Sequence, residues 1–505
     1  MDTRQKISQL VIARLDGGDI QKKFKYYRSL TRQGIGGFIV FGGGLKEVSR
    51  GIKRLQGDAG IPLFIASDLE QGLGQQIQGG TLFPPAMAVG RAINSKRRDD
   101  IRLLRRSVRI MADEIIAAGF NVVFSPVLDV NTNPKNPIIC TRAYSDDPEE
   151  VAWFGKELIK GFQSRGLIAC AKHFPGHGDT ERDSHRELPV VKAGIKRLRN
   201  VELRPFAAAV KAGVTMVMVG HLKVPALDPK LPSTFSRKII QRLLRDQMGF
   251  KGLVITDAMN MHAVSRYDPI PGGKRQEKER SACLNALKAG ANILLHPRDP
   301  EEVIDFLYSH QDRIMPEVNR SLQRVLRIKK KIVNTLPLSA GIRRIGQRSH
   351  RETAFEMTER SINTDNEILA INKIFRAVIL IIDDDDSRAG KRFAETIRDH
   401  YPGVKKLYVD NKRPADAGKI LDKVKDRLLI AGVFSKISAW KGRSGLSVKL
   451  RSVLKKAVRT SGYSVVAGFC CPHVLRDIKA DVVIRAYSGS EQAQEAVGKV
   501  ICDPE

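Results

Sequence analysis

The 505-residue chain has no apolar stretch long enough to cross a membrane. No run of 18 apolar residues occurs. The first residues, MDTRQKISQLVIARLDG, also lack an apolar core of the length found in signal peptides. We therefore expect no membrane span and a cytoplasmic location.

Sequence patterns for metal binding are also missing. The cysteines have no ligand-like spacing, Cys470 and Cys471 are adjacent, and no HExxH motif occurs. Scattered cysteines of this kind fit a reducing compartment. We expect no metal site. The six cysteines are Cys140, Cys170, Cys283, Cys470, Cys471 and Cys502.

Acidic residues are few relative to basic ones. The 86 Lys and Arg outnumber the 55 Asp and Glu, which gives a formal net charge of +31. Such a charge attracts nucleic acid and other anions. However, the basic residues are spread along the chain, and no nucleic-acid-binding motif occurs. We therefore expect no specific nucleic-acid partner, and interpret the charge as a property of the whole surface.

Short apolar runs alternate with helical stretches through the first two thirds of the chain. This rhythm is typical of a parallel barrel, in which active-site residues follow the carboxyl ends of the strands. The predicted strands are 36–41, 62–67, 121–126, 167–172, 214–220, 252–256 and 291–295.

Titratable side chains are concentrated in residues 171–189, AKHFPGHGDTERDSHRELP, directly after a predicted strand. The stretch holds His173, His177 and His185, and its prolines and glycines break regular structure. A polar loop that leaves a strand in this way favours catalysis or substrate binding. Metal binding and a structural cap, for example by Asp183, are the alternatives.

The same segment resembles the signature loop of glycoside hydrolase family 3, in its β-N-acetylglucosaminidase branch, where the pattern is close to KHFPGHGxTxxDSHxxLP. The resemblance implies an α/β chain with an N-terminal TIM-type (β/α)8 barrel and a smaller C-terminal α/β sandwich domain. Residues 10–13 would supply the first barrel strand. The matching residues are Lys172, His173, Phe174, Pro175, Gly176, His177, Gly178, Thr180, Asp183, Ser184, His185, Leu188 and Pro189.

The resemblance divides the chain into three parts. We expect the barrel at 1–335, a linker with a connecting helix at 336–370, and the sandwich domain at 371–505. The linker begins in an unpatterned stretch with Pro, Gly and Ser.

Asp68 follows the predicted strand 62–67 and matches a sugar-binding Asp of the family, with Glu70 and Gly72 also matching; a helix cap is the alternative. The family segment is close to DQEGGRVxR, and Gln76 stands where its second Arg binds the sugar.

His221 is a candidate for substrate binding because it lies at a strand end, and capping of the barrel rim is the alternative. The expected substrate-binding residues are Asp68, Arg142, Lys172, His173 and His221.

Asp257 ends another apolar run, and its segment matches the family's nucleophile pattern GxxxSDxxxM, with Thr256 in place of Ser. The resemblance implies a covalent glycosyl-enzyme and net retention. In this branch a dyad replaces the second carboxylic acid, so His185 would be the acid/base and Asp183 its orienting partner. Imidazole titrates near neutrality and can both give and take a proton. No cofactor is expected.

The sequence thus predicts an enzyme, an exo-β-N-acetylglucosaminidase that releases terminal N-acetylhexosamine from muropeptides or related oligosaccharides. Alternatives within the family are a β-N-acetylglucosaminide phosphorylase and a β-glucosidase or xylosidase; the latter two lack the DSH element at 183–185. A sugar-binding protein on a decayed barrel is the non-enzymatic alternative. The partner would be a saccharide containing N-acetylglucosamine, and we expect a monomer or an oligomer of unknown size.

Overall fold

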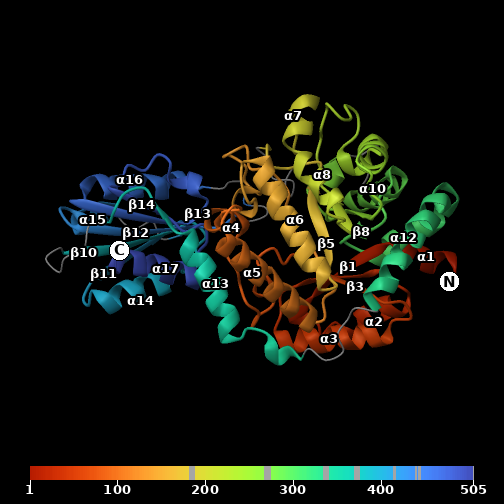
Figure 1. Cartoon of the computed structure of the whole chain (residues 1–505), viewed down its shortest axis with the longest axis horizontal. Helices are drawn as coiled ribbons and strands as arrows, with labels where there is room; N and C mark the ends of the chain where they lie inside the picture. Colours follow the sequence, from red (N-terminus) through yellow and green to blue (C-terminus); the bar gives the residue numbers. More distant parts are fainter. Residues whose placement is uncertain are drawn as a thin grey trace. The chain divides into compact units, whose positions relative to one another are not determined.

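The computed structural model describes residues 1–180, 188–266, 274–333, 341–368, 376–412, 417–437, 441 and 445–503. The chain separates into two compact units, and Figure 1 shows their elements. The first unit comprises 1–82, 101–133 and 143–351, and the second comprises 83–100, 134–142 and 352–505. The predicted boundaries at 335 and 371 stay a prediction.

Eight parallel strands form the barrel of the first unit, in the order β7-β6-β5-β4-β3-β2-β1-β8. The two end strands also meet, because the Thr256 amide donates to the Ile293 carbonyl at 3.0 Å and the Asn292 amide donates to the Val254 carbonyl at 2.8 Å. The predicted barrel is therefore confirmed, with the early strand as its first. The strands are β1 (Val11–Asp16), β2 (Gly37–Phe41), β3 (Phe64–Ser67), β4 (Val122–Val123), β5 (Ile168–Phe174), β6 (Met216–Val219), β7 (Leu253–Thr256) and β8 (Leu294–Leu295).

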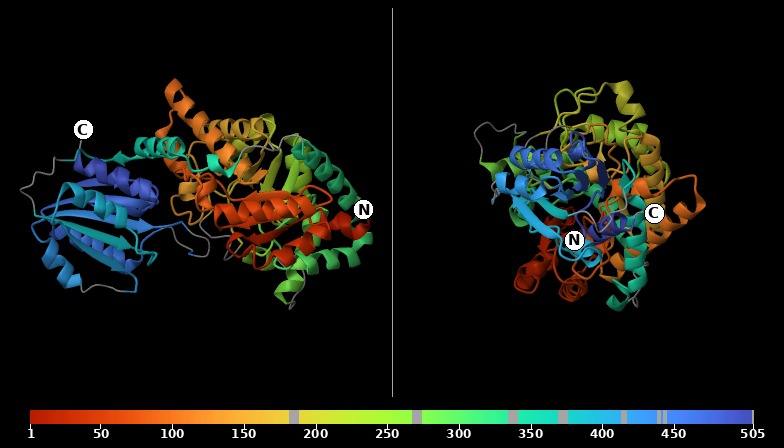
Figure 2. Two further views of the ribbon diagram at one scale, coloured as in Figure 1. Left: turned by 90° about the horizontal axis from the view of Figure 1, so that it is seen from below. Right: turned by 90° about the vertical axis from the view of Figure 1, so that its left-hand side faces the viewer.

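Helices follow the strands and lie around the barrel (Figure 2). The strands are buried along nearly their whole length because the outer side chains pack on these helices. Their bounds are α1 (Thr3–Ser8), α2 (Phe24–Arg32), α3 (Leu45–Asp58), α5 (Arg98–Ala117), α6 (Pro148–Ser164), α7 (Ile195–Asn200), α8 (Arg204–Lys211), the π-helix η5 (Lys238–Gln247), α9 (His262–Arg266), α10 (Arg275–Ala289), α11 (Pro300–Ser309) and α12 (Met315–Val333).

The second unit contains a six-stranded sheet in the order β11-β10-β12-β13-β14-β9. Its pairs are parallel except β14 with β9, which are antiparallel. One core contains apolar residues of α14 and α17, and a separate core contains those of α15 and α16, so helices cover both faces. The predicted α/β sandwich is confirmed. Its elements are β9 (Asn363–Thr364), β10 (Ala377–Asp383), α14 (Lys391–His400), β11 (Lys405–Asp410), α15 (Ala417–Val424), β12 (Leu428–Ser435), α16 (Val448–Thr460), β13 (Tyr463–Cys470), β14 (Val482–Arg485) and α17 (Glu491–Cys502), with α4 (Ala86–Ala92) and α13 (Arg348–Ser361) from earlier in the chain.

A disulfide joins two distant parts of the second unit, which the cysteine spacing did not predict and which goes against the reducing compartment expected from that spacing. Cys140, in the segment 134–142, is bonded to Cys471 directly after β13, and their Cα atoms are 6.4 Å apart. Cys140 also belongs to one of the apolar cores of the sheet. The segment is therefore covalently fastened to the sheet's carboxyl end. Within the described residues, no helix is long and apolar enough to span a bilayer.

Candidate active site

The strand register places Asp68, Lys172 and Asp257 on one face of the barrel wall, because side chains alternate along a strand. The strands that carry them, β3, β5 and β7, are not neighbours. Even so, the charges of all three residues act on the Cys170 thiol, whose pKa burial raises. Only side chains inside the barrel could meet in this way, so the three point into its mouth. The register is fixed by Ala66, Val122, Ile168, Cys170, Met216 and Leu253.

Lys172 joins two carboxylates at the floor of this mouth. Its ammonium group lies 2.7 Å from Asp68 Oδ1 and 2.7 Å from Glu70 Oε1, and its side chain is 1% exposed. Two opposite charges offset the cost of burying the ammonium group. Asp68 is 32% exposed, so its carboxylate is fixed by the lysine but accessible to a ligand. This arrangement suits the binding of sugar hydroxyls.

His173 and the loop after β5 are organised around Asp129. The Asp129 carboxylate is fully buried and accepts hydrogen bonds from His173 Nδ1 at 2.7 Å and from the His177 amide at 2.7 Å. Burial acts to raise the pKa of Asp129, but the two histidines outweigh it and hold this pKa below its ordinary value. The carboxylate therefore stays ionised and fixes the first turn of the loop.

His177 is neutral at physiological pH, because burial lowers its pKa to about 4. Its Nδ1 lies 2.7 Å from the hydroxyl of Thr180, which is itself fully buried. These contacts support a loop-shaping role for this histidine. A group with such a pKa is a poor proton donor near neutrality.

His221 lies at the carboxyl end of β6, where the sequence placed it, and both ring nitrogens contact the protein. Nδ1 is 2.8 Å from the Thr234 hydroxyl and Nε2 is 3.1 Å from the Ala258 carbonyl oxygen. The ring is 2% exposed. These contacts fit the alternative of a cap at the barrel rim, next to the residue that follows Asp257.

Asp257 is partly exposed at the end of β7. Its Oδ1 accepts a hydrogen bond from the Ala258 amide at 2.7 Å, and its own amide donates to the Val219 carbonyl at 2.9 Å. Its charge also acts on the pKa of His177, which is carried by the loop after β5. The backbone thus fixes this carboxylate at the mouth, on the side of the loop.

Three other predicted site residues are not among the described residues of the barrel unit. Asp183 and His185 lie outside the described residues, and Arg142 belongs to the second unit, where its guanidinium donates to the Ile138 carbonyl at 3.3 Å. Gln76, in place of the expected arginine, accepts a hydrogen bond from the Gly42 amide at 3.2 Å. Gln76 therefore supports the glycine turn after β2.

Sequence reasoning did not assign a role to Asp129. It lies three residues after the predicted strand 121–126, between apolar neighbours, much as Asp68 and Asp257 follow their own strands. That recurring position was the available signal, but it gave no indication that the residue is fully buried.

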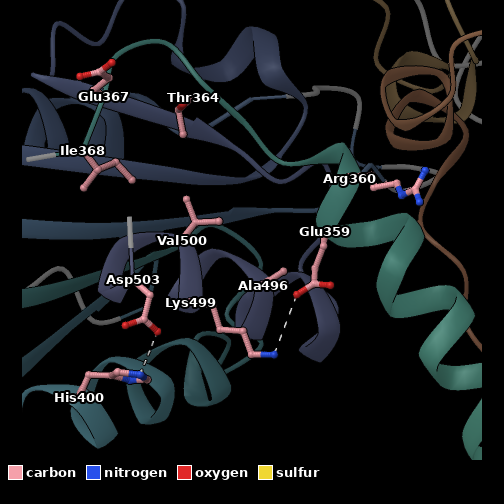
Figure 3. Close-up of a pocket in the computed structure, with 10 residues that line it drawn as sticks. All are labelled: Glu359, Arg360, Thr364, Glu367, Ile368, His400, Ala496, Lys499, Val500 and Asp503. Atoms are coloured by element: carbon pink, nitrogen blue, oxygen red, sulfur yellow. Dashed lines mark ion pairs between the residues drawn. The ribbon is translucent and has the colours of Figure 1, made fainter. Parts of the chain in front are cut away.

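A pocket of about 960 Å³ opens in the second unit, between α13, α14 and α17 (Figure 3). Two ion pairs lie in its lining: Lys499 is 4.0 Å from Glu359, and His400 is 3.4 Å from Asp503. Burial raises the pKa of Glu359. None of the residues that the sequence selected lines this pocket. Among the described residues, no group of His, Cys, Asp or Glu is arranged to hold a metal ion.

Comparisons with known proteins agree with this geometry. The family model described as "Glycosyl hydrolase family 3 N terminal domain" matches residues 2–328. A protein of Pseudoalteromonas piscicida named Beta-hexosaminidase A is 29% identical over 393 residues, which are 70% of this chain and 64% of that protein. A Beta-hexosaminidase of Nitrosomonas eutropha is 32% identical over 284 residues, 55% of this chain and 78% of that protein. The chain thus spans less than two thirds of the first of these relatives.

Similarity in structure extends along the whole chain. A solved glycoside hydrolase family 3 β-N-acetylglucosaminidase from Paenibacillus sp. str. FPU-7 matches with a TM-score of 0.84 and 27% sequence identity. The match covers 99% of this chain and 97% of that one. Both compact units therefore have counterparts in that protein.

Proposed function

Because the chain belongs to glycosyl hydrolase family 3, we propose that it is a retaining exo-β-N-acetylglucosaminidase that removes terminal β-linked N-acetylhexosamine from a saccharide. The observation that carries this proposal is the inward-facing set of Asp68, Lys172 and Asp257 at the carboxyl ends of three barrel strands. The names of the relatives and of the solved neighbour support the choice of sugar.

In the proposed reaction the carboxylate of Asp257 attacks the anomeric carbon while the bond to the leaving oxygen breaks. A covalent glycosyl-enzyme results, and its hydrolysis from the opposite side restores the original configuration. The hydrogen bond from the Ala258 amide to Oδ1 orients the carboxylate for this attack.

Proton transfer falls to the dyad of Asp183 and His185. His185 protonates the leaving oxygen in the first step and takes a proton from the attacking water in the second. Asp183 orients the ring. Among the nearby histidines, His177 is unsuited to this task because its pKa is about 4. His173 is held by Asp129, 2.7 Å from Nδ1, in a position suited to binding the sugar.

Asp68, Lys172 and His173 would bind hydroxyl groups of the sugar. Lys172 Nζ, 2.7 Å from Asp68 Oδ1, holds this carboxylate in place, so that it can accept two hydrogen bonds from vicinal hydroxyls. The natural substrates we propose are cell-wall muropeptides released during peptidoglycan recycling.

Release of 4-nitrophenol from its β-N-acetylglucosaminide, compared with its β-glucoside, tests the sugar. We expect kcat/KM to be at least tenfold higher for the N-acetylglucosaminide. A preference for the glucoside would favour the β-glucosidase alternative, and a protein inactive on both would be a sugar-binding barrel. Repeating the assay with phosphate and analysing the product separates hydrolysis from phosphorolysis.

The two catalytic assignments have separate tests. Asp257→Ala should abolish covalent labelling by a 2-fluoro sugar, and persistent labelling would exclude Asp257 as nucleophile.

His185→Ala should slow substrates with poor leaving groups far more than activated ones, because only the former need a proton on the departing oxygen. An equal loss on both kinds would contradict the acid role.

A further inference from the structure

Arg197, on α7, contacts the loop after β5, although it belongs to none of the motifs discussed above. Its Nη2 lies 3.2 Å from Asp179 Oδ2 and donates a hydrogen bond to the Thr132 hydroxyl at 3.0 Å. Asp179 belongs to the loop, and Thr132 follows Asp129 on the chain that leaves β4. One guanidinium group therefore joins the same two segments that Asp129 holds together from inside the barrel unit.

A buried carboxylate is the third partner of this guanidinium. Glu202, which follows the end of α7, is 2% exposed, and its Oε1 lies 3.4 Å from Arg197 Nε. Burial raises the pKa of Glu202, the charge of Asp179 acts in the same direction, and the charge of Arg197 acts against both. A buried carboxylate is costly without a compensating charge. Arg197 thus supplies the positive charge that lets Glu202 and Asp179 lie near each other.

Glu202 also packs against the beginning of the loop. A Cβ atom on Gly176 would lie 2.8 Å from Glu202 Cβ and 3.1 Å from Glu202 Cγ, so the loop backbone approaches this side chain closely. The loop is held at Gly176 by packing and at Asp179 by charge. Since Arg197 contacts Glu202 and Asp179, it connects these two points of attachment.

We propose that Arg197 is a positioning residue that holds the loop after β5 so that the His185 imidazole reaches the leaving oxygen of the substrate. Asp179 lies only four residues before Asp183 and six before His185, so a shift at Asp179 would displace the dyad. The inference rests on the proposed glycosidase function and adds to it a residue that acts through the dyad without touching the sugar.

An ordinary surface ion pair does not account for these contacts. Such a pair contributes little to stability and has one exposed partner on each side. Arg197 instead contacts a buried carboxylate, a hydroxyl and a loop carboxylate at once. Arginine suits this task because its planar guanidinium presents several donors in fixed directions, whereas a lysine has a single charged point on a flexible stem.

Two substrates test the proposal, phenyl and 4-nitrophenyl β-N-acetylglucosaminide, because the phenolate of the first leaves poorly and depends more on the acid. We expect Arg197→Gln to lose about tenfold to a hundredfold in kcat/KM on the phenyl substrate, as for a displacement of about 1 Å, and less than about threefold on the 4-nitrophenyl one. Covalent labelling by the 2-fluoro sugar should persist, because the nucleophile Asp257 is unchanged. Arg197→Lys should restore part of the loss.

A double-variant cycle with Asp179→Asn tests whether the effect passes through the loop. Both single changes remove the contact between the guanidinium and the loop carboxylate. We therefore expect the double variant to lose little more on the phenyl substrate than Arg197→Gln alone, whereas residues that act independently would give losses that multiply.

Arg199→Gln is the matched control, since Arg199 is exposed on the same helix. It should leave the ratio of the two substrates unchanged. Equal losses by Arg197→Gln on both substrates, no loss on either, or losses that multiply in the double variant would overturn the assignment while leaving the glycosidase function intact. A wild type that cleaves neither substrate would overturn the proposed function together with this inference.

Discussion

Lys172 and Lys329 are both 1% exposed, yet their ammonium groups meet different partners. Lys172 lies between the carboxylates of Asp68 and Glu70. Lys329, on α12, donates instead to the neutral oxygens of Gln9 and Gly36, at 2.8 and 2.7 Å. Burial lowers its pKa to about 7. The first lysine is thus a charged part of the site, and the second is a titratable group in the barrel base.

Lys329 should make stability depend on pH above neutrality. Its folded-state pKa of about 7 lies below the ordinary 10.5, so between these values the unfolded chain binds more protons. The free energy of unfolding should therefore rise with pH in this window, by at most about 1.4 kcal/mol per pH unit. Lys329→Met should remove that increment in urea unfolding at pH 7, 8 and 9. Lys53→Met, at an exposed position of α3, should keep it; an unchanged increment in Lys329→Met would contradict the reasoning.

The sequence indicated candidate residues for the site but not the contacts between them. Asp68 and Asp257 could be recognised because each follows a short apolar run. The bridge from Lys172 to Glu70 and the burial of Asp129 depend on strands far apart in the sequence, and no local pattern encodes them.

At the scale of elements, the loop after β5 depends on close backbone packing. A Cβ atom on Gly178 would lie 1.8 Å from the Val130 carbonyl oxygen, which belongs to the main chain. Gly176 has a φ of +125°, in a region that favours glycine. The glycines of this segment, which the sequence analysis described as breaking regular structure and as part of the family signature, thus allow the loop to lie against the chain that carries Asp129.

Gly178→Ala should consequently impair the enzyme. The added methyl group must displace the backbone at Val130, which we expect to cost about 1–3 kcal/mol in stability. Since the loop leads into residues 183–185, kcat/KM should also fall at least tenfold. Gly57→Ala is the control, because that position in α3 has open space and should gain about 0.5–1 kcal/mol. Normal activity in Gly178→Ala would show that the loop tolerates the shift.

The disulfide fastens another element, the segment 134–142, to the second unit. Cys140→Ser and Cys471→Ser should each lower the stability of that unit by about 2–4 kcal/mol, and the double variant should lose no more, because either change removes the same bond. Guanidinium unfolding without reductant measures this. Cys502→Ser, at a free buried thiol, is the control. Additive losses in the double variant, or no loss in either single one, would contradict a bond between the two residues.

At the scale of the whole molecule, the rhythm of apolar runs predicted a parallel barrel, and the resemblance to the family implied an α/β sandwich after it, because both signals lie in local stretches of the sequence. The sequence did not predict that 83–100 and 134–142 join the second unit, since such exchanges are set by tertiary contacts. The sequence likewise could not predict the disulfide between residues 331 positions apart.

The net charge of +31 is the molecule's other global property, and it should make stability increase with salt. Like charges repel in the compact state, and raising ionic strength shortens the range of this repulsion to about 10 Å at 0.1 M. On α12, Arg320, Arg324 and Arg327 follow one another at helical spacing, and burial together with the other two lowers the pKa of Arg324. We expect the unfolding midpoint to rise by about 2–4 °C between 20 and 300 mM NaCl. Replacing these three arginines with glutamine should raise the midpoint at low salt and reduce the increment, whereas a midpoint that falls with salt would mean that attractive ion pairs outweigh the repulsion.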